Sequence, residues 1–170
     1  MRRTVLVLAA AALLAGGCAP GQREPTAGEP GSIDPARAAT VAVGAGLVTA
    51  IAPERTVGEA VERISSDIVA AGGTVIATVD HAAAARGAGL ELPPTTVVIF
   101  GNPQAGTPLM QASQTAGIDL PQKLLVYESE GQTMIAFNDP SYLARRHGID
   151  GQDQRLAMIR QALERLATGS

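Results

Sequence analysis

The spacing of apolar residues after residue 56 predicts an amphipathic helix. Between Val57 and Ile68 the large apolar side chains follow one another at steps of three or four residues, which places them on one helical face. Thr56 and Glu59 stand where a capping box would satisfy two free backbone N–H groups at the helix start. The pair Gly72-Gly73 follows, and glycine readily takes the left-handed conformation that ends a helix.

A second amphipathic pattern lies near the C-terminal end of the chain. Apolar residues from Leu156 to Leu166 repeat at steps of three, four and three residues, and Asp153 precedes them as the expected cap. Three other helical segments are predicted, over Ala82–Ala88, over Gln104–Ala116 with Gly117 at its end, and from Asp139-Pro140 to His147.

Runs rich in β-branched residues alternate with these helices and predict strands. The two runs on either side of Ser129-Glu130-Gly131 are close enough to form a hairpin. The pattern predicts one α+β domain, in which helices pack on one face of an antiparallel sheet. The predicted strands cover Thr40–Ala52, Thr74–Val79, Thr95–Phe100, Lys123–Glu128 and Gln132–Phe137.

Composition limits both the core and the partners. The chain has two Phe, two Tyr and no Trp, so its core must be built from Val, Ile, Leu and Ala. The segment before Cys18 holds two of the 13 basic residues and none of the 16 acidic ones, which leaves the remainder with a net charge of about −5. Because basic clusters and aromatic stacking platforms are both lacking in the sequence, we expect no nucleic-acid partner.

The first residues have the organisation of a secretory signal. The pair Arg2-Arg3 precedes a short apolar run, Val5–Ala15, which falls well below the ~20 residues that a membrane-spanning helix needs. The stretch Leu14–Cys18 resembles the lipobox of bacterial lipoproteins, although the usual leucine stands one position early. This resemblance implies that Cys18 is acylated, with palmitate for example, and becomes the N-terminus of an anchored protein.

Three segments are therefore expected. They are a signal peptide over residues 1–17, a lipidated cysteine with a flexible tether over 18–38, and a folded domain over 39–170. The tether is rich in Gly, Pro and Glu and has almost no large apolar side chains to bury. Ala19 after the cysteine resembles the outer-membrane type of lipoprotein. We expect a cell-envelope protein on the outer membrane, facing the periplasm, with the lipid on Cys18 as its membrane contact.

Several short motifs in the folded part occur together in one order. Those of the first half are Asp80-His81-Ala82, Leu92-Pro93-Pro94-Thr95, Phe100-Gly101-Asn102-Pro103 and Gly106-Thr107; those of the second half are Asp119-Leu120-Pro121, Leu124–Glu128 and Phe137-Asn138-Asp139-Pro140. Over about Thr40 to Ala167 they resemble the domain-of-unknown-function 302 family. The resemblance implies a β-α-β₄-α fold similar to that of the TATA-binding protein, without its DNA-binding role, and a homodimer. It implies no biochemical activity.

Four polar residues form the candidate ligand-binding site. Asp80 and His81 end one predicted strand, Asn102 ends the next at a Gly-Asn-Pro break, and Thr107 follows. If these strand ends lie on one rim, the four side chains would line a single pocket, where a histidine beside a carboxylate serves as general base, metal ligand or proton sensor. The structural alternative is that Asp80 and Asn102 cap the segments that follow them.

Metal and nucleophile chemistry have little support in the sequence. Its only histidines are His81 and His147, and lipidation would use its one thiol, so we predict no metal site and assign no cofactor. The serines lack a nucleophile-elbow context, so we predict no catalytic residue. The cluster Arg145-Arg146-His147 is interpreted as a solvated helix end.

The leading functional hypothesis is a lipid-anchored envelope protein whose domain is non-catalytic and binds a small ligand or serves an accessory role. A second hypothesis is a metal- or cofactor-dependent enzyme that uses His81 as base or ligand. A third is a structural dimeric envelope protein whose exposed apolar surface matters more than His81.

Overall fold

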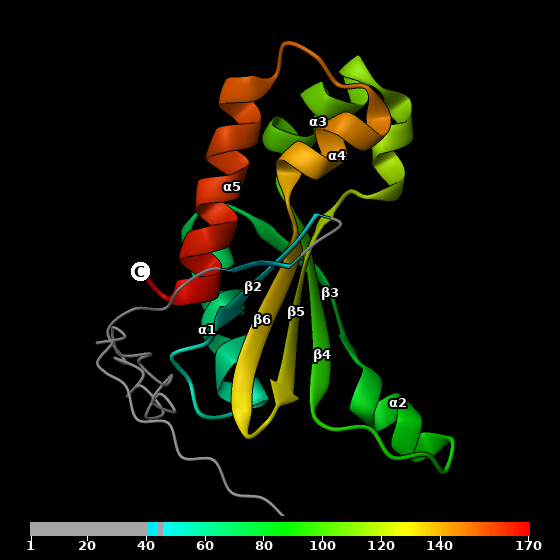
Figure 1. The fold of residues 1–170 in the computed structure, drawn as a ribbon, viewed down its shortest axis with the longest axis vertical. Helices are drawn as coiled ribbons and strands as arrows, with labels where there is room; N and C mark the ends of the chain where they lie inside the picture. Colours follow the sequence, from blue (N-terminus) through cyan, green and yellow to red (C-terminus); the bar gives the residue numbers. More distant parts are fainter. Residues whose placement is uncertain (1–40, 44–45) are drawn as a thin grey trace, which may run out of the picture. The chain divides into compact units, whose positions relative to one another are not determined.

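The computed structural model describes residues 41–43 and 46–170, so Cys18, the signal peptide and the tether lie outside the described residues. The described strands form one six-stranded antiparallel sheet in the order β1-β2-β6-β5-β4-β3 (Figure 1). The elements are β1 (Val41–Val43), β2 (Leu47–Ile51), α1 (Val57–Ala70), β3 (Thr74–Asp80), α2 (His81–Gly87), β4 (Thr95–Gly101), α3 (Pro103–Ala112), the 3₁₀ helix η1 (Gln114–Ile118), β5 (Gln122–Ser129), β6 (Gln132–Asn138), α4 (Pro140–His147) and α5 (Asp153–Thr168).

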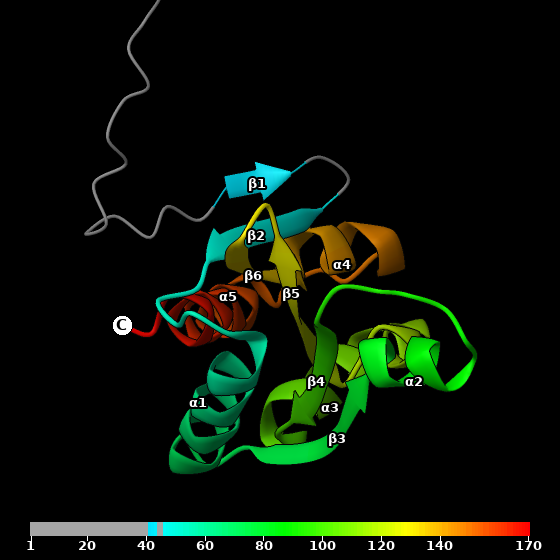
Figure 2. The ribbon, with the colours of Figure 1, turned by 90° about the horizontal axis from the view of Figure 1, so that it is seen from below.

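The predicted α+β class is confirmed, with the longest helices on one face of an antiparallel sheet. Helices α1 and α5 lie on the same side of the sheet (Figure 2). The capping box at the start of α1 is also confirmed, because Glu59 N donates to Thr56 Oγ1 at 3.3 Å and Thr56 N donates to Glu59 Oε2 at 3.2 Å. Strands β5 and β6 form the predicted hairpin, with positive φ angles at Glu130 and Gly131 as a two-residue turn requires.

The first predicted strand and the start of the last helix differ from the prediction. The single strand predicted over Thr40–Ala52 is two strands, β1 and β2, paired antiparallel. Gly46 precedes β2 with φ +82°, and a Cβ there would lie 2.1 Å from Cγ of Tyr142, so the close approach of α4 requires glycine. The cap of α5 is Gln152, and Asp153 is the first helical residue, where a carboxylate still favours the helix dipole.

The helix predicted over Gln104–Ala116 is interrupted at Ser113. This residue is extended, with φ −153° and ψ 112°, and separates α3 from η1. Its Oγ lies 3.0 Å from Oγ1 of Thr115. Serine hydroxyls compete with the backbone for local hydrogen bonds, which weakens the preference for a continuous helix at this position.

Two apolar clusters make up the core. The larger cluster packs the inner face of the sheet against α1 and α5; its members include Val48, Val98, Leu124, Val126, Ile135, Phe137, Ile64, Ile68 and Leu163. The smaller cluster joins α3, η1, α4 and the start of α5 through Leu109, Ala116, Ala144, Ile149 and Leu156. Ile159 packs against both clusters, so α5 connects the sheet to the group of short helices at one end of it.

The outer face of the sheet is also apolar. Leu125 alternates with Leu124 along β5 and points to this face, beside Val97 and Ala136 of the neighbouring strands. Leu47, on the same face, is 38% exposed. A shallow hollow of about 230 Å³ lies there. The sheet therefore has a covered face and a partly covered one.

Asp139 ties α4 to α5. Its Oδ1 accepts a hydrogen bond from Ser141 N at 2.8 Å and caps α4, and its Oδ2 accepts one from Arg160 of α5. Partial burial of the carboxyl opposes its ionisation, but the bonds from Ser141 and the charge of Arg160 outweigh burial, so the pKa of Asp139 is lowered. The motif Asn138-Asp139-Pro140 thus has a structural explanation, with Pro140 at the first helical position.

The two faces of β5 predict different costs for the same substitution. Leu124→Ala creates a cavity in the larger cluster, where Leu124 is 0% exposed, and should lower the free energy of unfolding by about 2–5 kcal/mol. Leu125→Ala, its matched control on the half-buried outer face, should cost clearly less. Urea unfolding of both variants measures the difference, and equal losses would contradict the assignment of the faces.

Candidate functional site

The structure separates the four candidate residues into two pairs. Strands β3 and β4 are antiparallel, with Thr74 opposite Gly101 and Asp80 opposite Thr96. Asp80 and His81 therefore lie at one end of this strand pair and Asn102 at the other, about 20 Å away along β3. Figure 1 shows the same separation, with α2 and α3 at opposite ends of the sheet. The expectation of one pocket lined by all four residues is not met, because the C-terminal ends of neighbouring antiparallel strands lie at opposite ends of the sheet.

Asp80 acts as a helix cap. Its Oδ1 accepts a hydrogen bond from Ala83 N at 2.8 Å, at the start of α2. His81 is exposed, and no hydrogen bond to its ring is found within the described part of the chain. The carboxylate therefore does not orient the imidazole. Among residues 41–43 and 46–170, no group of three or more His, Cys, Asp or Glu side chains could hold a metal ion.

Asn102 is also a cap, and it stands beside a cavity. Its Oδ1 accepts a hydrogen bond from Gln104 N at 2.9 Å, and its Nδ2 donates to Gly72 O at 3.4 Å. Pro103 occupies the first position of α3, where its missing N–H costs nothing. Thr107 lies on the same helix and borders the same cavity. The structure thus brings Asn102 and Thr107 together, without Asp80 or His81.

Two adjoining cavities flank the start of α3. The first, of about 410 Å³, lies between the C-terminal half of α1, the end of β4 and α5. The second, of about 560 Å³, lies between the start of β3, α3 and the segment that leads into β5. We call the two together the α3 groove. Both are lined by Gly101, Asn102, Ala105, Gln122 and Ile159.

A side chain of α5 bonds the backbone of α3 beside the groove. Pro108 inside α3 has no N–H, so the carbonyl of Gln104 lacks the partner that a regular helix would supply. Nη1 of Arg155 donates to that carbonyl at 3.0 Å. On the other side, Nζ of Lys123 donates to Pro121 O at 3.0 Å and steadies the segment that borders the second cavity.

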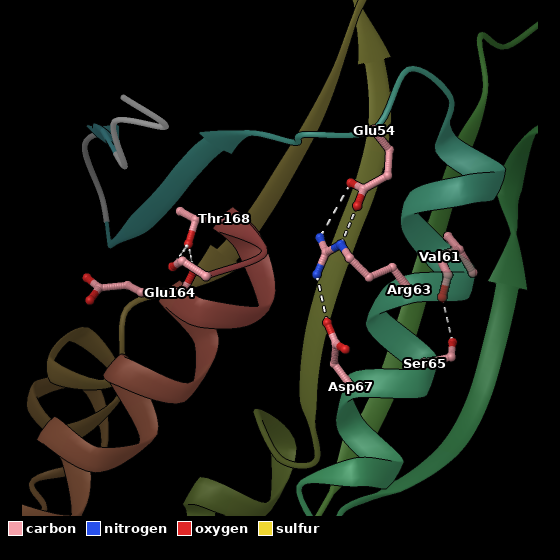
Figure 3. A network of polar contacts seen from close by, with 8 residues as sticks. Glu54, Val61, Arg63, Ser65, Asp67, Glu164 and Thr168 are labelled. Atoms are coloured by element: carbon pink, nitrogen blue, oxygen red, sulfur yellow. Dashed lines mark hydrogen bonds and ion pairs between the residues drawn. The ribbon is translucent and has the colours of Figure 1, made fainter. Parts of the chain in front are cut away.

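The groove is lined mainly by apolar side chains, and its charges lie at one end. Asp67 and Arg165 border the first cavity, whereas the residues that line the second are all uncharged. Asp67 Oδ2 accepts a hydrogen bond from Arg63 Nη1 at 3.0 Å, and the same guanidinium contacts Glu54 (Figure 3). Burial lowers the pKa of Arg63, but the two carboxylates outweigh burial, and the pKa is raised.

A polar cluster that sequence reasoning missed lies near the end of α4. His147 Nε2 lies 2.6 Å from Asp119 Oδ2, and His147 Nδ1 lies 2.9 Å from Thr115 Oγ1. The side chain of His147 is only 5% exposed, which corrects its interpretation as part of a solvated helix end. The imidazole thus contacts a carboxylate through one ring nitrogen and a hydroxyl group through the other.

This order of hydroxyl, imidazole and carboxylate is the order found in activated nucleophiles. However, Thr115, Asp119 and His147 border neither cavity of the α3 groove. The cluster instead joins α4 to η1 and to the segment before β5. His147 is 28 residues from Asp119 and 32 residues from Thr115 in the sequence, and no local pattern signals these contacts.

The fold and the groove define a class of small α+β domain, in which two helices back an antiparallel sheet and a third borders an apolar groove at its end. The chain belongs to the family described as Domain of unknown function DUF302, whose model matches residues 49–166. The crystal structure of an uncharacterized conserved protein DUF302 from Bacillus stearothermophilus is similar, with a TM-score of 0.65 and 22% identity over 72% of this chain and 95% of that chain. That likeness shows the fold.

Two curated relatives come from Brucella. Fluoride-specific ion channel FluC 1 of Brucella suis biovar 1 (strain 1330) is 44% identical over 108 residues, which is 63% of this chain and 42% of the relative. The protein of the same name from Brucella abortus biovar 1 (strain 9-941) is 44% identical over 63% of this chain and 40% of its own length. The chain thus spans about two fifths of these relatives. Within the part of the chain that the structure describes, no helix has the length and apolarity to cross a membrane.

The two histidines predict opposite outcomes on replacement. His147→Ala removes a nearly buried side chain that contacts both Asp119 and Thr115 and should lower the free energy of unfolding by about 1–3 kcal/mol. His81→Ala changes an exposed side chain and should stay within about 0.5 kcal/mol of the unaltered protein. Thermal or urea unfolding measures both. A larger loss of unfolding free energy for His81→Ala than for His147→Ala would contradict the structural role of His147.

Proposed function

We propose that this chain is a lipid-anchored binding protein of the bacterial cell envelope and that the α3 groove binds a small apolar ligand. The groove is the observation that carries the proposal. Its cavities of about 410 and 560 Å³ have the size of ligand pockets, which range over ~300–1,000 Å³. Apolar walls with a few polar groups such as Asn102, Gln122 and Thr107 are the usual lining of such pockets.

The distribution of polar groups favours binding over catalysis. The groove is bordered by apolar and uncharged polar side chains along most of its length, and the amide of Asn102 is already engaged in capping α3. The His147 cluster, which has the donors and acceptors for proton transfer, lies outside the groove. A ligand in the groove would therefore meet packing surfaces rather than a general base.

Two observations support a membrane location. The sequence around Cys18 resembles a lipobox, which would attach the folded domain to a membrane through acyl chains. The Brucella relatives bear the name of an ion channel, and an ion channel acts in a membrane. The homodimer implied by the family resemblance stays a prediction, and the partly covered outer face of the sheet is where we would place its interface.

Native mass spectrometry of the full-length protein tests the groove. We expect the folded protein to carry the extra mass of a bound apolar molecule, beyond the masses of the acylated chain and of any detergent. Ile76→Arg introduces a charge at the second cavity, where Ile76 is 57% exposed, and should reduce the ligand-bound fraction at least tenfold.

Val69→Arg is the matched control for that experiment. Val69 is 64% exposed on α1 and borders neither cavity of the groove, so its replacement should leave the ligand in place. Equal loss in both variants, or a wild-type protein without any bound molecule, would count against the proposal. The same spectra report the oligomeric state and test the expected homodimer.

Replacement of Cys18 tests the anchor. Cys18→Ser removes the only thiol of the chain, so the protein should lose metabolically incorporated palmitate and the membrane attachment that depends on it. Radiolabelling and fractionation of cells that express each form measure both effects. Retention of the acyl label by Cys18→Ser would show that the lipid is attached at another residue.

A further inference from the structure

The shape of the α3 groove restricts the shape of its ligand. The two cavities adjoin at a set of shared lining residues, of which Gly101 has no side chain and Ala105 has only a methyl group. A Cβ at Gly101 would already lie 3.4 Å from Cβ of Pro121. A ligand that occupies both cavities passes this junction and must be long enough to extend from one cavity into the other. An unbranched chain has this shape.

The polarity of the groove gives such a chain a direction. The second cavity is bordered by Ile76, Met110 and Leu120, with no charged side chain among its lining residues. The first cavity has Asp67 and Arg165 at its border. Asp67 is already bound by Arg63, while Arg165 has no ion pair within the described residues. The lining residues of the two cavities thus include one cationic side chain, Arg165 at the first cavity, whereas the polar groups of the second cavity, such as Thr107 and Gln122, are uncharged.

We propose that the α3 groove binds a single extended acyl chain, with its tail in the second cavity and its oxygen-bearing head at Arg165 in the first. This inference rests on the proposed function and adds the chemical class of the ligand. The chain can come from a free fatty acid or from a phospholipid of the membrane to which the protein is anchored. Both sources supply the same unbranched chain with oxygen atoms at one end.

Photoaffinity labelling of the full-length protein in phosphatidylcholine nanodiscs tests the direction. A palmitate analogue with a diazirine near its methyl end should label residues of the second cavity, such as Met110. An analogue with the diazirine near the carboxylate should label residues of the first cavity, such as Leu166. Labels that fall outside the groove, or at the same residues for both analogues, would overturn the proposal.

Competition by unlabelled fatty acids tests the extended shape. In the unaltered protein, affinity should rise from octanoate through laurate to palmitate, by up to about fourfold for each methylene buried. Ala105→Leu narrows the junction, so its affinity should stop rising once the chain fills one cavity. Ala112→Leu is the matched control, because Ala112 is exposed on the same helix and borders neither cavity.

The outcomes separate this inference from the proposed function. Identical chain-length profiles for Ala105→Leu and Ala112→Leu would overturn the extended chain, and the direction test on the unaltered protein stands even if Ala105→Leu does not fold. A diazirine phosphatidylcholine in the nanodisc identifies the source: labelling of the groove by either probe supports the acyl chain, and labelling by neither overturns it. If neither probe labels the groove while Ile76→Arg still displaces another bound molecule, the inference fails and the proposed function remains.

Discussion

Helix α5 packs its apolar stripe against two clusters at once, and most of the architecture depends on this contact. Leu163 is buried against the sheet, Leu156 against the short helices α3, η1 and α4, and Ile159 touches both groups. Because the hydrophobic effect rewards buried apolar area wherever it lies, one helix can stabilise two separate cores. The α3 groove borders Ile159, where the two cores meet.

Polar contacts add to the attachment of the short helices, which the smaller apolar cluster alone would stabilise weakly. The short helices are attached by three of them: Asp139 with Arg160, Arg155 with the carbonyl of Gln104, and His147 with Asp119. Each contact joins residues that are 21 to 51 positions apart in the sequence, and the contacts of Asp139 and His147 are partly buried. Long-range polar contacts thus help to position the helices that border the groove, whereas the residues that line the groove are mainly apolar.

The candidate site was only partly predictable. Asn102 and Thr107 border the groove as a pair because both lie at or just beyond the start of one helix, and such local relations can be predicted from a turn signal. The motif of Asp80 and His81 did not predict their position, because the direction of a strand decides at which end of the sheet its last residues lie. His147 was assigned to solvent because its sequence neighbours are arginines, yet its contacts come from Thr115 and Asp119.

Local patterns in the sequence by themselves determined the periodic helices, the β5–β6 hairpin, the caps at Thr56 and Asp80, and the α+β class. These features depend on neighbours within a few residues, where side-chain spacing and turn chemistry act directly. The tertiary structure alone decided the division of Thr40–Ala52 into two strands, the separation of Asp80 from Asn102, the burial of His147 and the existence of the α3 groove. Each of these depends on which distant segments pack together, and the pattern of one segment does not contain that information.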